Sequence, residues 1–153
     1  MLTNSSKHPF QQRLAQNILQ KRKSWKATKR GENAGWREIA GTLYYFRSRW
    51  EAHYARYLEW LRVNKLITEW LHEPKFFDFP IKHGVTRYLP DFQVIELSGV
   101  STWIEVKGFM DSKSKTKIAR FKKYYPNERL MVVDSKWFSH NNRQFKGIVP
   151  GWE

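Results

Sequence analysis

Two acidic residues and a lysine lie at the ends of two neighbouring predicted strands, where they could act together. Asp91 follows Pro90 near the start of one strand, and Glu105 and Lys107 lie at the end of the next. Side chains two residues apart share a face of a strand, so Glu105 and Lys107 point the same way and Val106 points to the core. Carboxylates suit Mg²⁺, which polarises a phosphate and lowers the pKa of bound water. A nearby lysine can position that water or neutralise charge on the phosphoryl oxygens, so the three residues predict metal-dependent phosphodiester hydrolysis.

A hairpin is the element that must bring these three side chains together. The sequence favours one strand over residues 87–97, interrupted at Pro90, and a second over residues 102–107, joined by a turn at Ser98-Gly99. Glu-x-Lys is a common spacing on exposed strands, so a surface cluster of ion pairs is the alternative interpretation. Both acids lie at the strand ends that the hairpin would bring together, which favours a catalytic site.

The remaining pattern predicts an α/β fold in which a central mixed β-sheet is flanked by helices. Ser48 is expected to cap a helix over residues 49–64, and Glu51 completes a capping-box pattern three residues later. We expect the first three strands of the sheet to be antiparallel, with residues 75–80 as the first of them. The other expected elements are a hairpin at residues 38–46, a basic helix at residues 111–125 and a core strand at residues 129–133.

The charge balance indicates the class of partner. The chain has 28 Lys and Arg against 14 Asp and Glu, a net charge of +14, together with 8 Trp, 7 Tyr and 10 Phe. Phosphates attract such a charge and bases stack on aromatic rings, so nucleic acid is favoured over a ribosome-associated or membrane-surface role. The residues expected to contact DNA are Lys21, Arg22 and Lys23 in a basic N-terminal arm, Arg47 and Arg49, and Lys113, Lys115, Lys117, Arg120, Lys122 and Lys123 in the basic helix.

Composition also excludes several classes of protein. The chain contains no Cys, which excludes disulfide bonds, thiol nucleophiles and cysteine-ligated zinc. No apolar run approaches the roughly 20 residues needed to cross a bilayer, and the first residues lack the apolar segment of a signal peptide. We therefore expect a soluble, intracellular protein of the cytoplasm with no membrane contact. The five His residues show no metal-ligand spacing, so a histidine general base is not expected.

The order and spacing of the motifs resemble those of a known group of nucleases. Pro90-Asp91 followed by Glu105-Val106-Lys107 resembles the PD-(D/E)xK nuclease superfamily. Phe46-Arg47-Ser48, then Glu51, and later Pro-Asp-Phe and Glu-x-Lys-Gly resemble the endonuclease I family, the phage enzymes that resolve Holliday junctions. The resemblance covers about residues 46–108 and leaves the N-terminal arm and the C-terminal tail without a counterpart.

The resemblance implies a restriction-endonuclease-like nuclease fold and a role for each motif residue. Asp91 and Glu105 would be metal ligands, with the Val106 carbonyl as a third, and Lys107 would be the catalytic lysine. Glu51 would be a further carboxylate for a second metal or for the attacking water, contributed by its own subunit or by the partner of a homodimer. The implied cofactor is Mg²⁺, with Mn²⁺ as a substitute. Together with the charge distribution, the resemblance predicts a basic arm at residues 1–35, a nuclease domain at residues 36–138 and a tail at residues 139–153.

The function implied by the resemblance is cleavage of branched DNA. The enzyme would be a Mg²⁺-dependent endonuclease acting on four-way junctions and related branched double-stranded DNA, in a phage-infected or bacterial cell. Two symmetric nicks across a junction suit two active sites, which favours a homodimer. Two alternatives stay open: a sequence- or mismatch-specific endonuclease of the same superfamily, and an inactive nuclease fold that only binds DNA.

Overall fold

A short β-hairpin is the first element of the described residues. The computed structural model describes residues 33–152, and the predicted DNA contacts at Lys21, Arg22 and Lys23 lie outside this range. Strands β1 (Gly35–Ile39) and β2 (Thr42–Phe46) pair in antiparallel fashion around Ala40 and Gly41. Both turn residues have positive φ, 50° and 77°, as a tight two-residue hairpin turn requires. The predicted hairpin at residues 38–46 is confirmed, although it begins earlier than expected.

Helix α2 (Arg49–Val63) begins where the sequence predicts it. The Ser48 hydroxyl accepts a hydrogen bond from the Glu51 N–H at 3.1 Å and caps the helix. Tyr54 and Leu58 recur at helical spacing and are buried, together with the small residues Ala52 and Ala55.

The central sheet is mixed, as predicted, and its order is β3-β6-β7-β8. The first three strands are antiparallel, and β8 runs parallel to β7. A parallel pair needs a crossover, which helix α3 provides with Asp111 as its N-cap. The bounds are Glu69–His72 for β3, Phe92–Ile95 for β6, Ser101–Val106 for β7, Ser112–Tyr124 for α3 and Arg129–Val133 for β8.

The prediction that residues 75–80 form the first strand of this sheet was wrong. Residues 75–80 do not join it, because β3 pairs with β6 in their place. Only β4 (Phe77–Asp78) is extended there, and it pairs with β5 (Arg87–Tyr88) in a separate ribbon. The ribbon is short because prolines lie at positions 74, 80 and 90 of the sequence, where no backbone donor is available to a ladder.

Helix α4 (Ser135–Ile148) spans the predicted boundary between the nuclease domain and the tail. Asp134 caps it by accepting hydrogen bonds from the N–H groups of the first turn. Phe138 and Phe145 lie two helical turns apart and are buried, and Phe138 stacks on Trp50 with ring centroids 4.6 Å apart. The core therefore continues past the last predicted strand.

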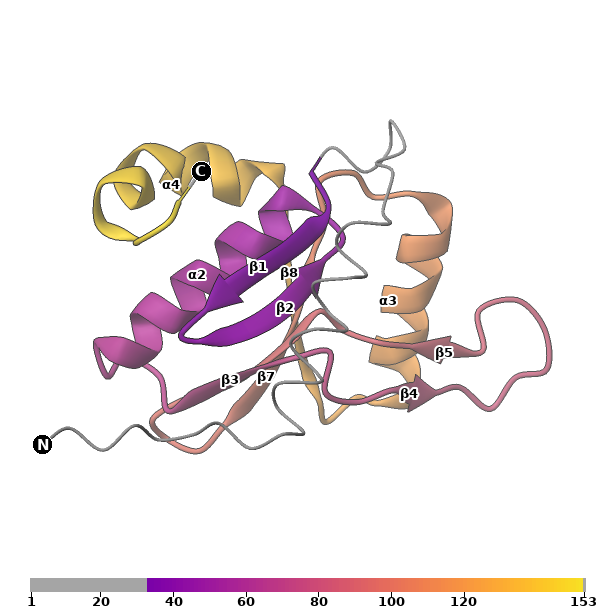
Figure 1. The fold of residues 1–153 in the computed structure, drawn as a ribbon. Helices are drawn as coiled ribbons and strands as arrows, with labels where there is room; N and C mark the ends of the chain where they lie inside the picture. Colours follow the sequence, from indigo (N-terminus) through magenta and orange to yellow (C-terminus); the bar gives the residue numbers. More distant parts are fainter. Residues whose placement is uncertain (1–32, 153) are drawn as a thin grey trace, which may run out of the picture. The chain divides into compact units, whose positions relative to one another are not determined.

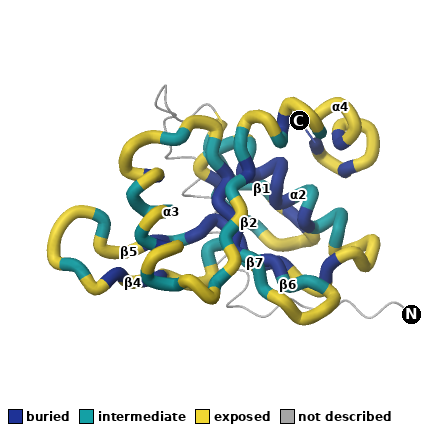
Figure 2. The backbone as a smooth tube through the Cα atoms, turned by 180° about the vertical axis from the view of Figure 1, so that it is seen from behind, coloured by how far each residue is buried: buried dark blue, intermediate teal, exposed yellow. Residues whose placement is uncertain are grey.

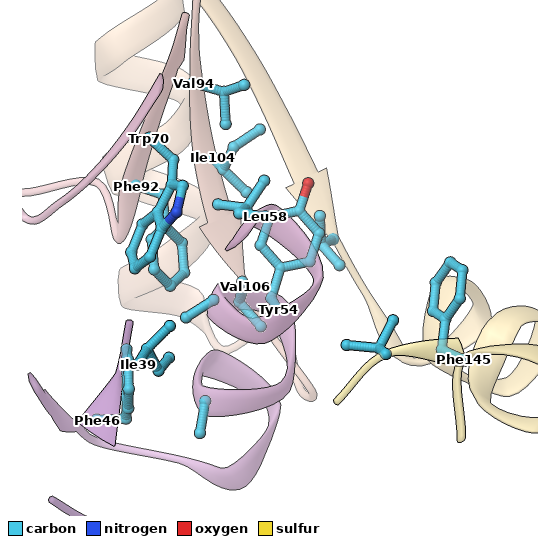
Figure 3. Packing of buried hydrophobic residues seen from close by; sticks show 14 of the residues in the cluster. Ile39, Phe46, Tyr54, Leu58, Trp70, Phe92, Val94, Ile104, Val106 and Phe145 are labelled. Carbon is cyan, nitrogen blue, oxygen red and sulfur yellow. The ribbon is translucent and has the colours of Figure 1, made fainter. Parts of the chain in front are cut away.

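The sheet separates two apolar clusters. Phe92 and Ile104 face α2 and α4, and Figure 3 shows them packed with Tyr54, Leu58 and other core side chains. On the opposite face, Trp103 packs with the ribbon and with α3. Figure 1 shows this layering, with α2 and α3 on opposite sides of the strands. Figure 2 shows that burial is concentrated in the strands and α2, whereas the loop joining β4 to β5 is largely exposed. No helix in the described range is long and apolar enough to cross a membrane.

Candidate active site

All four residues predicted to be catalytic line one pocket. It has a volume of about 270 Å³ and lies where β7 ends, beside the N-terminus of α2. Its walls come from the β2–α2 junction, the start of β6, the end of β7 and one residue of α3. The lining residues are Arg47, Ser48, Glu51, Asp91, Glu105, Val106, Lys107, Gly108 and Lys117.

Three carboxylates in this pocket are almost fully buried. Glu51, Asp91 and Glu105 are 7%, 4% and 3% exposed. A buried charge is costly unless it is paired and hydrogen-bonded, so the partners of each carboxylate matter. A larger pocket of about 350 Å³ lies elsewhere and includes Glu38 and Glu59, but neither of these acids is buried. The burial of its acids, and not its volume, therefore identifies the smaller pocket as the candidate active site.

Asp91 is held at the start of β6 from two sides. Its Oδ2 accepts a hydrogen bond of 2.7 Å from the Val106 N–H, and its Oδ1 accepts one of 3.1 Å from the Arg47 guanidinium. Arg47 also pairs with Glu73, whose N–H donates to the Asp91 carbonyl at 2.9 Å. Burial, and then the nearby Glu105 and Glu51 carboxylates, raise the pKa of Asp91 well above its ordinary range. The site therefore disfavours an uncompensated negative charge on Asp91.

Glu105 is positioned by residues from the ribbon and from α3. The Tyr88 hydroxyl donates to its Oε2 at 2.8 Å, and the Lys117 ammonium lies 3.6 Å from its Oε1. The same ammonium lies 5.2 Å from the centroid of the Tyr88 ring. Burial, and then the charge of Glu105, raise the pKa of Tyr88, so its hydroxyl stays a neutral donor.

Glu51 is both a capping residue and a pocket residue. The Ser48 hydroxyl donates to its Oε1 at 3.2 Å, and the Arg47 N–H donates to its Oε2 at 2.9 Å. In a standard capping box this second bond would come from the capping residue itself, so here it arises one residue earlier. Burial raises the pKa of Glu51. The structural and functional interpretations of Glu51 are therefore compatible.

The predicted lysine and the basic residues take different positions around the pocket. Lys107 lines it, and its N–H donates to the Val133 carbonyl at 2.8 Å, which fixes the backbone beyond β7. Arg49 lies outside the acid pocket and donates to the Asn33 side chain at 2.8 Å. Arg120 donates to the Val85 carbonyl and so ties α3 to the ribbon. The exposed lysines of α3 are Lys113, Lys115, Lys122 and Lys123.

The oxygen atoms that line the pocket are of the type that binds a hard divalent cation. Two of the carboxylates already pair with basic side chains. Carboxylate and carbonyl oxygens are the ligands of Mg²⁺. Asp91 is paired with Arg47 and Glu105 with Lys117, and within residues 33–152 no group of three acidic or histidine side chains is arranged to hold a metal ion. A bound metal would therefore share Asp91 and Glu105 with Arg47 and Lys117, or displace these cations.

Sequence reasoning missed two residues of this network, Tyr88 and Glu73. Tyr88 lies three residues before Asp91 in a β-prone run, which indicates only a core position. Glu73 has φ of 45°, in the left-handed region that non-glycine residues rarely adopt. Its N–H bond to the Asp91 carbonyl depends on this turn after β3, which the sequence does not mark.

One comparison with known proteins identifies a family. A family model described as "Protein of unknown function (DUF1064)" matches residues 33–140, which include every pocket residue named above. No curated protein matches the chain.

Proposed function

The chain belongs to the DUF1064 family of proteins of unknown function, and we propose that it is a Mg²⁺-dependent endonuclease selective for branched DNA. Its substrate would be the phosphodiesters of four-way junctions and related branches. One observation carries the proposal: Glu51, Asp91, Glu105 and Lys107 line a single pocket in which the three acids are buried. These are the residues to which the resemblance assigns catalytic roles, although they lie up to 56 positions apart in the sequence (107 − 51).

The finer fold assignment is part of the same proposal. In a restriction-endonuclease-like fold, the acid and the Glu-x-Lys motif would lie on adjacent strands of a mixed sheet. Here Asp91 precedes β6, and Glu105 lies on β7 with Lys107 just after it, while β8 runs parallel to β7. This arrangement supports the assignment.

The residues to which the resemblance assigns roles divide the tasks of the proposed reaction. Asp91, Glu105 and the Val106 carbonyl would hold Mg²⁺. Glu51 would accept a proton from the attacking water as its oxygen bonds to phosphorus, while the bond from phosphorus to the leaving sugar oxygen breaks and a solvent water protonates that oxygen. Mg²⁺, when bound, supplies a Lewis acid for the scissile phosphate. Lys107 would neutralise charge that develops on the phosphoryl oxygens. Tyr88 keeps one oxygen of Glu105 oriented, which is the role of groups that support a ligand from behind.

Basic residues around the pocket would hold the DNA backbone. The exposed lysines of α3 lie on the same helix as Lys117, which lines the pocket. Their contacts would give affinity that falls with salt, but no base sequence. With a net charge of +14 for the whole chain, binding should be strong at low salt.

A DNA-binding protein without nuclease activity is the second candidate. It is favoured by the ion pairs that Asp91 and Glu105 form with Arg47 and Lys117. A cleavage panel with Mg²⁺ on four-way, three-way, flap and plain duplex DNA separates the candidates. We expect the unaltered protein to cut branched DNA with Mg²⁺, and we expect Asp91→Ala to lose this cutting while it still binds branched DNA in Ca²⁺. Binding with no cutting by the unaltered protein would establish the second candidate, and equal cutting of plain duplex would reject branch selectivity.

We also propose that Glu51 serves its own subunit, because it lines the same pocket as Asp91 of the same chain. Mixing Glu51→Ala and Asp91→Ala subunits of the proposed homodimer tests this. If both residues act in one subunit, no site of the mixed dimer is complete and no cleavage returns. Recovered cleavage would mean that Glu51 comes from the partner.

A further inference from the structure

An exposed phenylalanine lies beside the candidate active site. Phe109 is 79% exposed and lies in the loop between β7 and α3. It follows Gly108, which lines the acid pocket, and it is two residues after Lys107. Phe76, by comparison, is 50% exposed and is covered by the Arg87 guanidinium at 4.8 Å from its centroid. An aromatic ring so open to solvent at this position is available to a ligand.

The backbone that carries Phe109 is anchored on both sides. A Cβ on Gly108 would lie 3.0 Å from the Trp50 ring, so the loop packs tightly on that ring and only glycine fits without a shift. Trp50 is itself stacked on Phe138. On the other side, Asp111 accepts a hydrogen bond of 2.7 Å from the Ser114 N–H and fixes the start of α3. The ring is therefore presented from a defined position.

A second hollow adjoins the acid pocket next to this loop. It has a volume of about 240 Å³, and it shares Ser48 and Gly108 with the acid pocket. Its other lining residues are Asn33, Arg49 and Trp50. Arg49 donates to the Asn33 side-chain carbonyl oxygen at 2.8 Å, which leaves the amide N–H groups of Asn33 and the other guanidinium N–H groups as donors to the edge of a nucleobase or to a nucleotide phosphate.

We propose that Phe109 and this hollow form a nucleobase subsite next to the scissile phosphate. The inference rests on the proposed function and names the feature of DNA that the site selects. An unpaired base beside the scissile phosphate enters the hollow, and the Phe109 ring stacks on a neighbouring base of the strand. Bases of plain duplex are already stacked and paired, and extracting one is costly, whereas bases at a branch or bubble are more easily released. The subsite would thus favour DNA with unstacked nucleotides.

A binding experiment tests the subsite without requiring cleavage. Affinity for a DNA bubble and for plain duplex of equal length is measured in Ca²⁺ by fluorescence anisotropy. Phe109→Ala should weaken bubble binding by about tenfold and leave duplex binding unchanged, because aromatic stacking on unpaired bases is lost. Phe109→Trp should retain the preference for the bubble. Phe76→Ala removes an exposed phenylalanine from the ribbon and should change neither affinity.

The outcomes separate the subsite from the catalytic proposal. An unchanged bubble-to-duplex ratio in Phe109→Ala, or an equal loss in Phe76→Ala, would overturn the subsite even if the protein cuts DNA. If Phe109→Ala loses the preference and the unaltered protein cuts no DNA with Mg²⁺, the subsite stands and the proposed nuclease activity fails. Thermal unfolding of each variant checks folding, which should be unaffected because Phe109 is largely in solvent.

Discussion

The β6–β7 strand pair carries a carboxylate beside a cation at each of its ends, and only one end buries them. At the turn end, Glu96 and Arg129 lie 3.7 Å apart, with side chains 45% and 64% exposed. At the open end, Glu105 and Lys117 lie 3.6 Å apart, with side chains 3% and 22% exposed. A hydroxyl donates to the carboxylate at each end, from Thr102 to Glu96 and from Tyr88 to Glu105.

The two ends have similar ion-pair distances but different energetics. An exposed pair such as Glu96–Arg129 contributes about 0–1 kcal/mol because water screens it. Burying Glu105 and its neighbours costs desolvation energy that pairing offsets only in part, so stability alone gives no reason to keep them. Burial of several acids, and not the presence of an ion pair, therefore distinguishes a candidate catalytic site from a surface cluster.

The largest difference between the ends should appear in catalysis. Glu105→Gln should lower cleavage of branched DNA about a thousandfold or more, because the amide is a poor Mg²⁺ ligand. The matched variant Glu96→Gln should cut like the unaltered protein. Single-turnover rates with Mg²⁺ measure both, and an equal loss in the two variants would remove the distinction.

Loss of a cation should have the next largest effect. Lys107→Met should slow cleavage about a hundredfold, since a group that neutralises charge in the transition state is lost. Arg129→Met removes the cation of the turn end and should leave the rate within about twofold, because exposed pairs contribute little. The single-turnover rate is compared at saturating protein, so that weaker binding is not mistaken for slower chemistry. A normal rate for Lys107→Met would remove this lysine from the site.

Local signals made much of the fold predictable. Ser48 and Glu51 marked the start of α2, and the glycine turn at residues 98–99 marked the hairpin. The first strand of the sheet was misplaced because residues 75–80 alternate as a strand should, while the choice of β3 as the partner of β6 depends on long-range packing. Helix α4 was missed because its apolar contacts, Phe138 and Phe145, are separated by mostly polar residues.

The residues of the site that belong to a sequence motif could be predicted, whereas those brought to the site by tertiary packing could not. Asp91, Glu105 and Lys107 could be placed together from a hairpin alone, since its register brings their strand ends together. Tyr88 of the ribbon donates to Glu105, and Glu73, in the turn after β3, pairs with Arg47 and donates its N–H to the Asp91 carbonyl. No spacing in the sequence connects these two residues to the motif. These contacts depend on how distant segments pack together, which leaves no local signature in the sequence.

Removing the supporting hydroxyl at each end should give a smaller effect than removing a charge. Tyr88→Phe leaves one oxygen of Glu105 without its donor and should lower cleavage about tenfold, with a higher Mg²⁺ requirement. Thr102→Val removes the corresponding donor to Glu96 and should change neither. A Mg²⁺ titration distinguishes positioning from a packing role, because a packing defect would lower the unfolding temperature without shifting the Mg²⁺ dependence.

The last effect concerns stability and not catalysis, and it tests whether burial of the acids differs between the two ends. The pKa of Asp91 is raised in the folded protein, so the folded state binds this proton more tightly than the unfolded state. Stability from this group is present below the ordinary carboxyl pKa and is lost as pH rises toward the raised one. In EDTA, the unfolding free energy of the unaltered protein should therefore fall relative to Asp91→Asn between about pH 5 and about pH 7, by at most about 1.4 kcal/mol per pH unit. Urea unfolding measures this difference, with Glu96→Gln as a control for the loss of one charge. A difference that grows in the opposite direction would mean that Asp91 is stabilised as an anion. Mg²⁺ binds the ionised form and should therefore reduce the fall in unfolding free energy.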